Sequence, residues 1–373
     1  MTKQIFLFLS ALALLMLVSV TALAQTGSSN GKTEKAWTAP KTPWGDPDLQ
    51  GTWTGDDTWG VPFERPKEFG TRKTLTEDEL KDRQKRVQQS EEFVETGVRA
   101  GSAPGAHSPA VAQIEAASKG AAPPPPAQGL YGRGVDAAPV PGHWGEFARR
   151  PSHATSQVVD PPDGRIPPLT PEAQKLLDAK NAIRRRPPES WEDWSLYDRC
   201  ITRGVAGSII PVIYGNGLEI VQAPGYVSIR YEMVHDVRII PLGKQEHAGP
   251  GYRSYLGDPI GHWEGNTLVV DTTNFLGKLA IGANGDFGPP TSDQLHLVER
   301  FTRTADNRID YQMRVEDPKT YTAPWTIEFP ITHEPGYQLF EYACHEGNMA
   351  MRNMMSAARA EEAKKAAAGE AKQ

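Results

Sequence analysis

The chain has 373 residues, 38% of them hydrophobic and 23% charged, which permits a sizeable core and up to two domains. Its formal net charge is −6, from 40 basic and 46 acidic residues. An acidic chain whose longest basic run is Arg184-Arg185-Arg186 is a poor nucleic-acid binder, so no nucleic-acid partner is expected.

The N-terminus has the features of an export signal. Lys3 provides a positive start, residues 5–20 are apolar, and Ala22-Leu23-Ala24 is a small-x-small cleavage site. The apolar run is short for a membrane anchor, and no basic cluster follows it. We therefore expect a cleaved signal peptide over 1–24 and a mature protein in the periplasm or outside the cell, without a membrane segment.

An extended N-terminal region is predicted over 46–196, after a flexible leader over 25–45. A short strand is expected around Gly51-Thr52-Trp53. Residues 97–142 are dominated by Gly, Ala, Pro and Ser, so this low-complexity segment cannot bury enough apolar surface to fold by itself.

Two helices are predicted in this region. Thr76, followed three residues later by Glu79, forms a capping box and predicts a helix over 76–94. Thr170 is an N-cap followed by proline, which predicts a second helix that ends near Arg186.

The region 197–348 is expected to form a lipocalin-like barrel or a strongly curved sheet. Short turn sequences such as Pro224-Gly225 separate its apolar segments, and connections this short join antiparallel neighbours. The predicted strands cover residues 218–223, 226–241, 267–275, 295–303, 308–316, 325–331 and 338–344. The fold class is therefore mainly β, an antiparallel meander. Residues 349–373 predict a helical tail.

Several of these strands place ionisable residues on the same face as apolar ones. A carboxylate or imidazole on an apolar face is costly unless it is paired or used. If these faces look inward, the lumen holds Tyr231, His235, Asp271, Glu299, Tyr311, Glu341 and His345. The candidate catalytic residues are Glu299, His235 and His345. The candidate ligand-binding residues are Tyr231, Asp271, Tyr311 and Glu341.

Glu299 is the candidate with the most specific prediction, because Leu297 and Phe301 lie on the same face of the predicted strand. Burial among such neighbours raises the pKa of a carboxyl group, as a general acid or base requires. The alternative is a structural ion pair with an arginine from a neighbouring strand. His235 likewise could be a proton carrier or a core histidine satisfied by one partner.

A metal site is a competing interpretation. His235, His262 and His345, with Glu341 or Asp271, could supply nitrogen and oxygen ligands. No HxH or HxxxH spacing supports such a site, so no metal is predicted and the cofactor stays unknown.

Cys200 and Cys344 are the two cysteines of the chain. In an oxidising compartment such a pair is predicted to form a disulfide, with two buried thiols or a metal pair as alternatives. The bridge would bring residues 197–199 beside His345.

Three sequence blocks, at 197–204, 261–275 and 342–348, resemble a family of exported bacterial proteins. The resemblance covers most of the chain outside 97–142 and the tail. It implies export and attaches no activity. Gly51-Thr52-Trp53 and the meander also resemble lipocalin-like proteins, including carotenoid hydratase types, which is an analogy of fold and not of reaction.

Three functions remain open. The first is binding of a small apolar or aromatic molecule in the lumen, and a small-molecule ligand is the expected partner. The second is an acid/base enzyme of hydratase, isomerase or lyase type, with Glu299 and a histidine as proton carriers. The third is a structural or interaction protein. An apolar pocket favours the first, a solvent-connected cavity with Glu299 near a histidine the second, and a filled interior the third.

Overall fold

The computed structural model describes residues 37–96 and 150–370, apart from 213–214, 244–245, 283–284, 287, 334–335 and 347. The expected signal peptide, the first part of the leader and the low-complexity segment 97–142 lie outside the described residues. Residues 39–373 form one compact unit, which contains all the described helices and strands.

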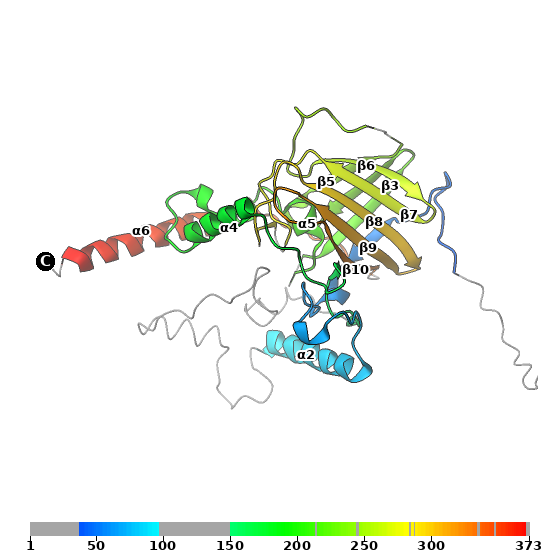
Figure 1. Ribbon diagram of the computed structural model, residues 1–373, viewed down its shortest axis with the longest axis horizontal. Helices are drawn as coiled ribbons and strands as arrows, with labels where there is room; N and C mark the ends of the chain where they lie inside the picture. The colour runs from blue at the N-terminus through cyan, green and yellow to red at the C-terminus, as the bar shows by residue number, and fades with distance from the viewer. Residues whose placement is uncertain are drawn as a thin grey trace, which may run out of the picture. The chain divides into compact units, whose positions relative to one another are not determined.

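An antiparallel, nearly closed barrel dominates this unit (Figure 1). Its strands follow the order β5-β4-β3-β1-β10-β9-β8-β7-β6, and β2 pairs with β10 off this path. The bounds are β1 (Gly51–Thr54), β2 (Val158–Asp160), β3 (Gly217–Ala223), β4 (Tyr226–Tyr231), β5 (Val237–Pro241), β6 (Asp258–Glu264), β7 (Thr267–Thr273), β8 (His296–Ala305), β9 (Arg308–Glu316) and β10 (Trp325–His333). The predicted mainly β meander is confirmed, and β1 joins it between β3 and β10.

The barrel closes along a seam where β5 and β6 face each other. Nine strands that alternate in direction leave the first and last running the same way, so closure requires a parallel pair. A parallel bridge between Leu242 and Gly261 provides it, whereas the described residues form no continuous ladder there. Gly261 allows the close approach, because a Cβ at this position would lie 2.8 Å from Ile240.

Two predicted strands are wrong. The segment 226–241 is not one strand, because a tight turn with a short 3-10 helix (Met233–His235) separates β4 from β5. The segment 338–344 is irregular. Strand β6 forms without having been predicted. Its sequence contains Pro259 and Gly261, which are poor strand formers, and it is held by its register with β7.

The predicted helices form as α2 (Glu77–Thr96), α4 (Pro171–Arg184) and α6 (Met349–Glu370). At α2 the capping box is present, with Glu79 N–H donating to Thr76 Oγ1 at 3.3 Å and Thr76 N–H donating to Glu79 Oε2 at 2.8 Å. Thr170 caps α4 by accepting from Ala173 N–H at 3.1 Å. In the described part of the chain, no helix combines the length and the apolar composition of a membrane span.

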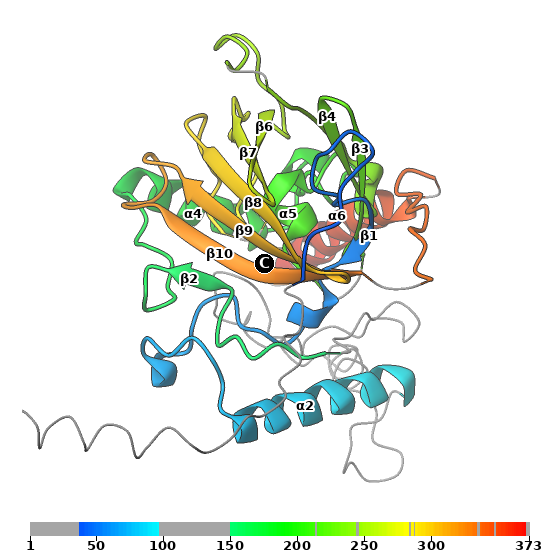
Figure 2. The same ribbon diagram turned by 90° about the vertical axis from the view of Figure 1, so that its right-hand side faces the viewer.

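The barrel interior is filled from both ends. Helix α5 (Gly204–Ile209) lies among the strands (Figure 2), and all six of its residues are buried. Leu49, from the segment before β1, is fully buried in the same hydrophobic cluster as Val205 of α5. Between them lie large aromatic side chains, including Phe301 and Tyr311 with ring centroids 4.9 Å apart. The core is therefore continuous through the barrel.

Candidate functional site

Glu299 lies in the barrel interior with none of its side chain exposed. Arg238 donates from its two terminal nitrogens to the two carboxylate oxygens, at 3.0 and 2.6 Å. Tyr311 Oη donates to the same carboxylate at 3.0 Å. Arg238 also donates to Tyr231 Oη at 3.2 Å and to Thr272 Oγ1 at 3.3 Å. These five residues form the interior network, in which both oxygens of Glu299 are engaged by protein groups.

Burial and pairing fix the protonation of the interior network. Burial raises the pKa of Tyr231 to about 12 and that of Tyr311 well above its ordinary value, so both hydroxyls keep their protons. Burial lowers the pKa of Arg238, but the Glu299 carboxylate more than offsets this and the net pKa is raised. The arginine therefore remains a cation, and the geometry is that of a structural ion pair.

Of the seven predicted lumen residues, the structure brings Tyr231, Glu299 and Tyr311 together. Asp271 lies on the outer face of β7, and its expected position in the lumen is wrong. The inward residues of β7 are Leu268, Val270 and Thr272, all fully buried. Val269, on the same face as Asp271, is buried by its neighbours on the outer wall, which explains why the pattern was misleading.

His235, Glu341 and His345 are exposed, so their expected positions in the lumen are also wrong. His235 lies in the turn between β4 and β5 with φ of 57°. Glu341 and His345 lie in the irregular segment that precedes α6. From these positions, none of the three side chains reaches Glu299.

Two members of the interior network are absent from the predicted lumen residues, Thr272 and, more importantly, Arg238. Counting alternate residues through 226–241 places it on the solvent face. The turn reverses the chain, however, and the register pairs Arg238 with Ile229, which points inward. Cross-strand partners share a face, so Arg238 points inward as well. No glycine or proline marks this turn, so the sequence carries only a weak signal for it.

Val234 adopts a left-handed backbone conformation in this turn, with φ of 63°. A β-branched side chain is disfavoured there by roughly 1–2 kcal/mol, whereas asparagine tolerates it. We expect Val234→Asn to raise the free energy of unfolding by about 1 kcal/mol. Urea denaturation followed by tryptophan fluorescence measures this change. Val237→Asn, in extended β5, is the matched control and should lower stability; equal effects of the two variants would contradict the explanation.

A second group of ionisable side chains lies on the outer face of β6 to β9. His247 Nε2 lies 2.9 Å from Asp271 Oδ1, and His296 Nε2 lies 2.9 Å from Asp271 Oδ2. The other ring nitrogens also face carboxylates, His247 Nδ1 at 3.3 Å from Asp258 and His296 Nδ1 at 3.4 Å from Glu316. We call these five residues the outer-wall cluster.

The outer-wall cluster is a chain of pairwise contacts along the barrel wall. Across the residues that the structure describes, no group of three or more His, Cys, Asp or Glu side chains is placed to hold a metal ion. No motif in the sequence indicates a role for His247, which lies in the connection between β5 and β6. His296 alternates along β8 with residues that point inward, so the sequence pattern predicts that it lies on the outer face. The pattern does not indicate which residue His296 contacts.

A small cavity lies between α5 and residues 275–281. Its volume is about 20 Å³, which is room for one or two water molecules. The lining is mainly apolar and includes Val205, Phe275, Leu279 and Leu295. Its polar members are Arg203, Tyr255, Lys278 and Thr291. Binding pockets for organic ligands measure roughly 300–1,000 Å³. In this conformation the cavity is therefore too small for the expected ligand.

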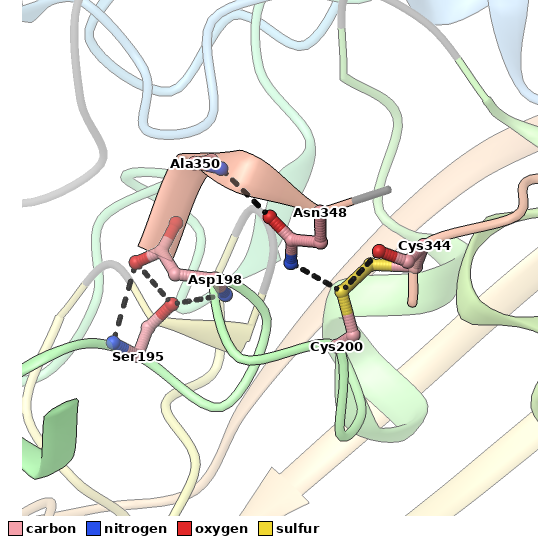
Figure 3. The surroundings of a disulfide bond; sticks show 6 residues. All are labelled: Ser195, Asp198, Cys200, Cys344, Asn348 and Ala350. Carbon is pink, nitrogen blue, oxygen red and sulfur yellow. Dashed lines mark hydrogen bonds between the residues drawn. A yellow bond between two sulfur atoms is a disulfide. The ribbon is translucent and has the colours of Figure 1, made fainter. Parts of the chain in front are cut away.

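Cys200 and Cys344 form the predicted disulfide, with an S–S distance of 2.06 Å (Figure 3). Asn348 Nδ2 donates to Cys200 Sγ at 3.0 Å. The side-chain oxygen of the same Asn348 accepts from Ala350 N–H at 3.1 Å, in the first turn of α6. The bridge thus ties the start of α6 to the segment that leads into α5.

These observations define the class as an antiparallel β-barrel protein with a filled interior and a disulfide-anchored C-terminal helix. The barrel agrees with a lipocalin-like fold only in its coarse features. No family model, curated protein or solved structure matches the chain.

Proposed function

We propose that the protein acts through the outside of its barrel, as a binding partner of another protein. The observation that carries this proposal is the state of the interior. Glu299 is saturated by Arg238 and Tyr311, and α5 and Leu49 fill the two ends. A molecule inside would have to displace packed side chains, which costs several kcal/mol in a well-packed core.

The outer face of β3, β4 and β5 offers a binding surface. Val221, Tyr226, Val237 and Ile239 are 49%, 53%, 46% and 63% exposed. The strand register makes them neighbours, because Val221 and Ile239 flank Ser228 on β4. Contiguous exposed apolar residues of this kind mark interaction sites more often than isolated ones do. We call these four residues the outer apolar patch.

Charged residues border the outer apolar patch. Arg230 lies directly opposite Val237 in the register and forms an ion pair with Glu219 at 3.1 Å. An apolar centre with a charged margin is the usual composition of a protein–protein interface. The outer faces of β8 and β9, by contrast, carry Arg300, Gln312 and Arg314. The partner that fits best is therefore a protein surface with an apolar centre and charges of both signs at its edge.

Site-specific photo-crosslinking tests this proposal. A photoreactive amino acid would replace Ile239 in the full chain, with Arg308, an exposed residue on β9, as the control position. We expect a discrete cross-linked protein from position 239 that is lost when Tyr226→Ser is added, and none from position 308. Equal products from both positions, or a product insensitive to Tyr226→Ser, would contradict the proposal.

A small apolar or aromatic ligand is the second candidate, favoured by the cavity beside α5. Its apolar lining with Arg203 and Tyr255 at hand suits a molecule with one polar end. Binding would require Leu279 to move and enlarge the cavity. Acid/base catalysis by Glu299 finds no support, because Arg238 occupies the carboxylate and His235 and His345 lie elsewhere.

Export and membership of the exported bacterial family remain part of the proposal. The disulfide supports an oxidising compartment, since such bridges persist in exported proteins and are rare in the reducing cytosol. N-terminal sequencing of the protein from its producing cells tests this point. We expect the mature chain to begin at Gln25; a chain that begins at Met1 would contradict export by cleavage.

A further inference from the structure

Strand β5 has one paired edge and one open edge. It pairs with β4, and in the part of the chain that the structure describes it forms no other ladder. Its second edge faces the seam, where a parallel bridge joins Leu242, just beyond β5, to Gly261 of β6. We propose that this open edge binds an extended segment of the partner protein, which adds to the barrel as a further strand beside β5. The inference rests on the proposed function, because it specifies how that partner is held.

The hydrogen-bond register determines which groups of β5 face the open edge. Asp236, the residue before β5, accepts from Tyr231 N–H at 2.9 Å. Hydrogen-bonded and non-bonded residues alternate along an antiparallel pair, so the even-numbered residues of β5 bond to β4. The N–H and C=O groups of Val237 and Ile239 therefore point away from β4. Within the described ranges, these four groups have no hydrogen-bond partner.

Two prolines prevent β6 from closing this edge. Gly243 N–H donates to Gly261 O at 3.2 Å, which sets the register of the parallel bridge. In that register, the preceding bonds of the ladder would come from the N–H groups of residues 241 and 259. Both residues are proline, which has no N–H to donate. The ladder therefore stops before it reaches Ile239.

The side chains of β5 also leave this edge unprotected. Charged side chains, lysine above all, commonly guard an exposed strand edge against pairing with another chain. Arg238 has the one charged side chain of β5, and it points inward with none of it exposed. Val237 and Ile239 are exposed and belong to the outer apolar patch. An added strand would therefore bond to the open edge through its backbone and place its side chains beside this patch.

Strand addition defines the chemistry of the partner segment. In this mode of recognition, main-chain bonds provide affinity and alternate side chains provide specificity. In a segment that runs antiparallel to β5, the residues opposite Val237 and Ile239 share their outward face. These residues should be apolar, because they extend the outer apolar patch. The open edge offers the backbone groups of two residues and ends at Pro241, so the paired part of the segment is short.

Hydrogen–deuterium exchange of the isolated full chain, resolved to single residues, tests whether the edge is open. We expect the amides of Val237 and Ile239 to exchange at least about tenfold faster than those of Arg238 and Ile240, which bond to β4. This measurement needs neither a partner nor a variant. Equal protection of all four amides would overturn the inference, because it would show that the edge is closed in solution.

Proline at position 237 tests whether the edge is used. Val237 is the first residue of β5, a place in a strand where proline is tolerated. Asp236 before it has φ of −59° and ψ of 133°, which suits a residue that precedes proline. Val237→Pro therefore removes one N–H from the open edge and no bond to β4. Val237→Thr is the matched control, because it also makes this side chain less apolar but keeps the N–H.

The readout is the yield of the cross-linked protein from a photoreactive amino acid at position 239. We expect Val237→Thr to lower this yield about threefold. Val237→Pro should lower it about tenfold further, because a carbonyl of the partner then lacks its donor. Equal yields from the two variants would overturn strand addition and leave the outer apolar patch as the binding surface. No product from position 239 in the otherwise unchanged chain would overturn the proposed function as well.

Amide exchange of the purified cross-linked product gives a result that does not depend on how well Val237→Pro folds. We expect the amide of Val237 to exchange about tenfold more slowly in the product than in the isolated chain, because it then donates to the added strand. An unchanged exchange rate at Val237 would overturn strand addition, since the partner would be held by side chains alone.

Discussion

Replacement of Glu299 by glutamine is expected to lower the free energy of unfolding by about 3–5 kcal/mol. The substitution keeps the size of the side chain and removes its charge. Arg238 would then be a buried cation whose carboxylate partner is gone, with none of its side chain exposed to water. Urea denaturation followed by the fluorescence of the buried Trp53 and Trp325 measures the loss.

A double-mutant cycle separates this explanation from a general packing defect. Arg238→Met alone should be about as costly as Glu299→Gln, whereas the pair Arg238→Met with Glu299→Leu should cost much less than the sum of the single changes. Glu328→Gln, on the outer face of β10, is the matched control and should change stability by less than about 0.5 kcal/mol. A loss below about 1 kcal/mol for Glu299→Gln would return this residue to consideration as a functional acid.

Removal of the disulfide is expected to lower the free energy of unfolding by a similar amount. Cys200 and Cys344 are separated by 144 positions, and in the chain-entropy model a loop of this length contributes about 4–5 kcal/mol. The double variant Cys200→Ser with Cys344→Ser should also release the start of α6, because Asn348 bonds to both the bridge and the helix. Urea denaturation measures the first effect, and amide exchange of the first turn of α6 measures the second.

Ser195→Ala provides the control for this region. Ser195 lies near the bridge, but its side chain bonds to Asp198 within a local turn (Figure 3). It should therefore cost only about 1 kcal/mol, the usual value for one hydrogen bond. An unchanged unfolding midpoint in the double serine variant would show that residual structure in the unfolded chain removes the benefit of the bridge.

The fold was predictable where the signal is local. Strands β3, β8 and β9 alternate between buried and more exposed residues. The turn after β3 carries Pro224-Gly225 and the turn between β8 and β9 carries Asn307. The caps at Thr76 and Thr170 predict their helices for the same reason, because the bond that begins each helix lies within three residues. The pairing of the two cysteines followed from their number and from the expected export signal, without knowledge of the fold.

The candidate site was only partly predictable, because it depends on contacts between distant segments. Glu299 was placed inward correctly, but the arginine that satisfies it lies 61 positions away and its face is set by the turn at Val234. A single misread turn inverts every later side chain on a strand, which is how Arg238 was assigned to solvent. Helix α5 is short and rich in glycine, so no periodicity reveals it, although it fills the end of the barrel where a ligand was expected.

Native mass spectrometry of the protein purified from its producing cells tests most directly whether the barrel is filled. If the interior is packed and the function lies outside, the measured mass equals the processed chain less the two hydrogens of the disulfide, with no small molecule retained. A stoichiometric organic mass that survives gentle transfer and leaves on denaturation would contradict this account, because it would show that the barrel opens and holds a ligand.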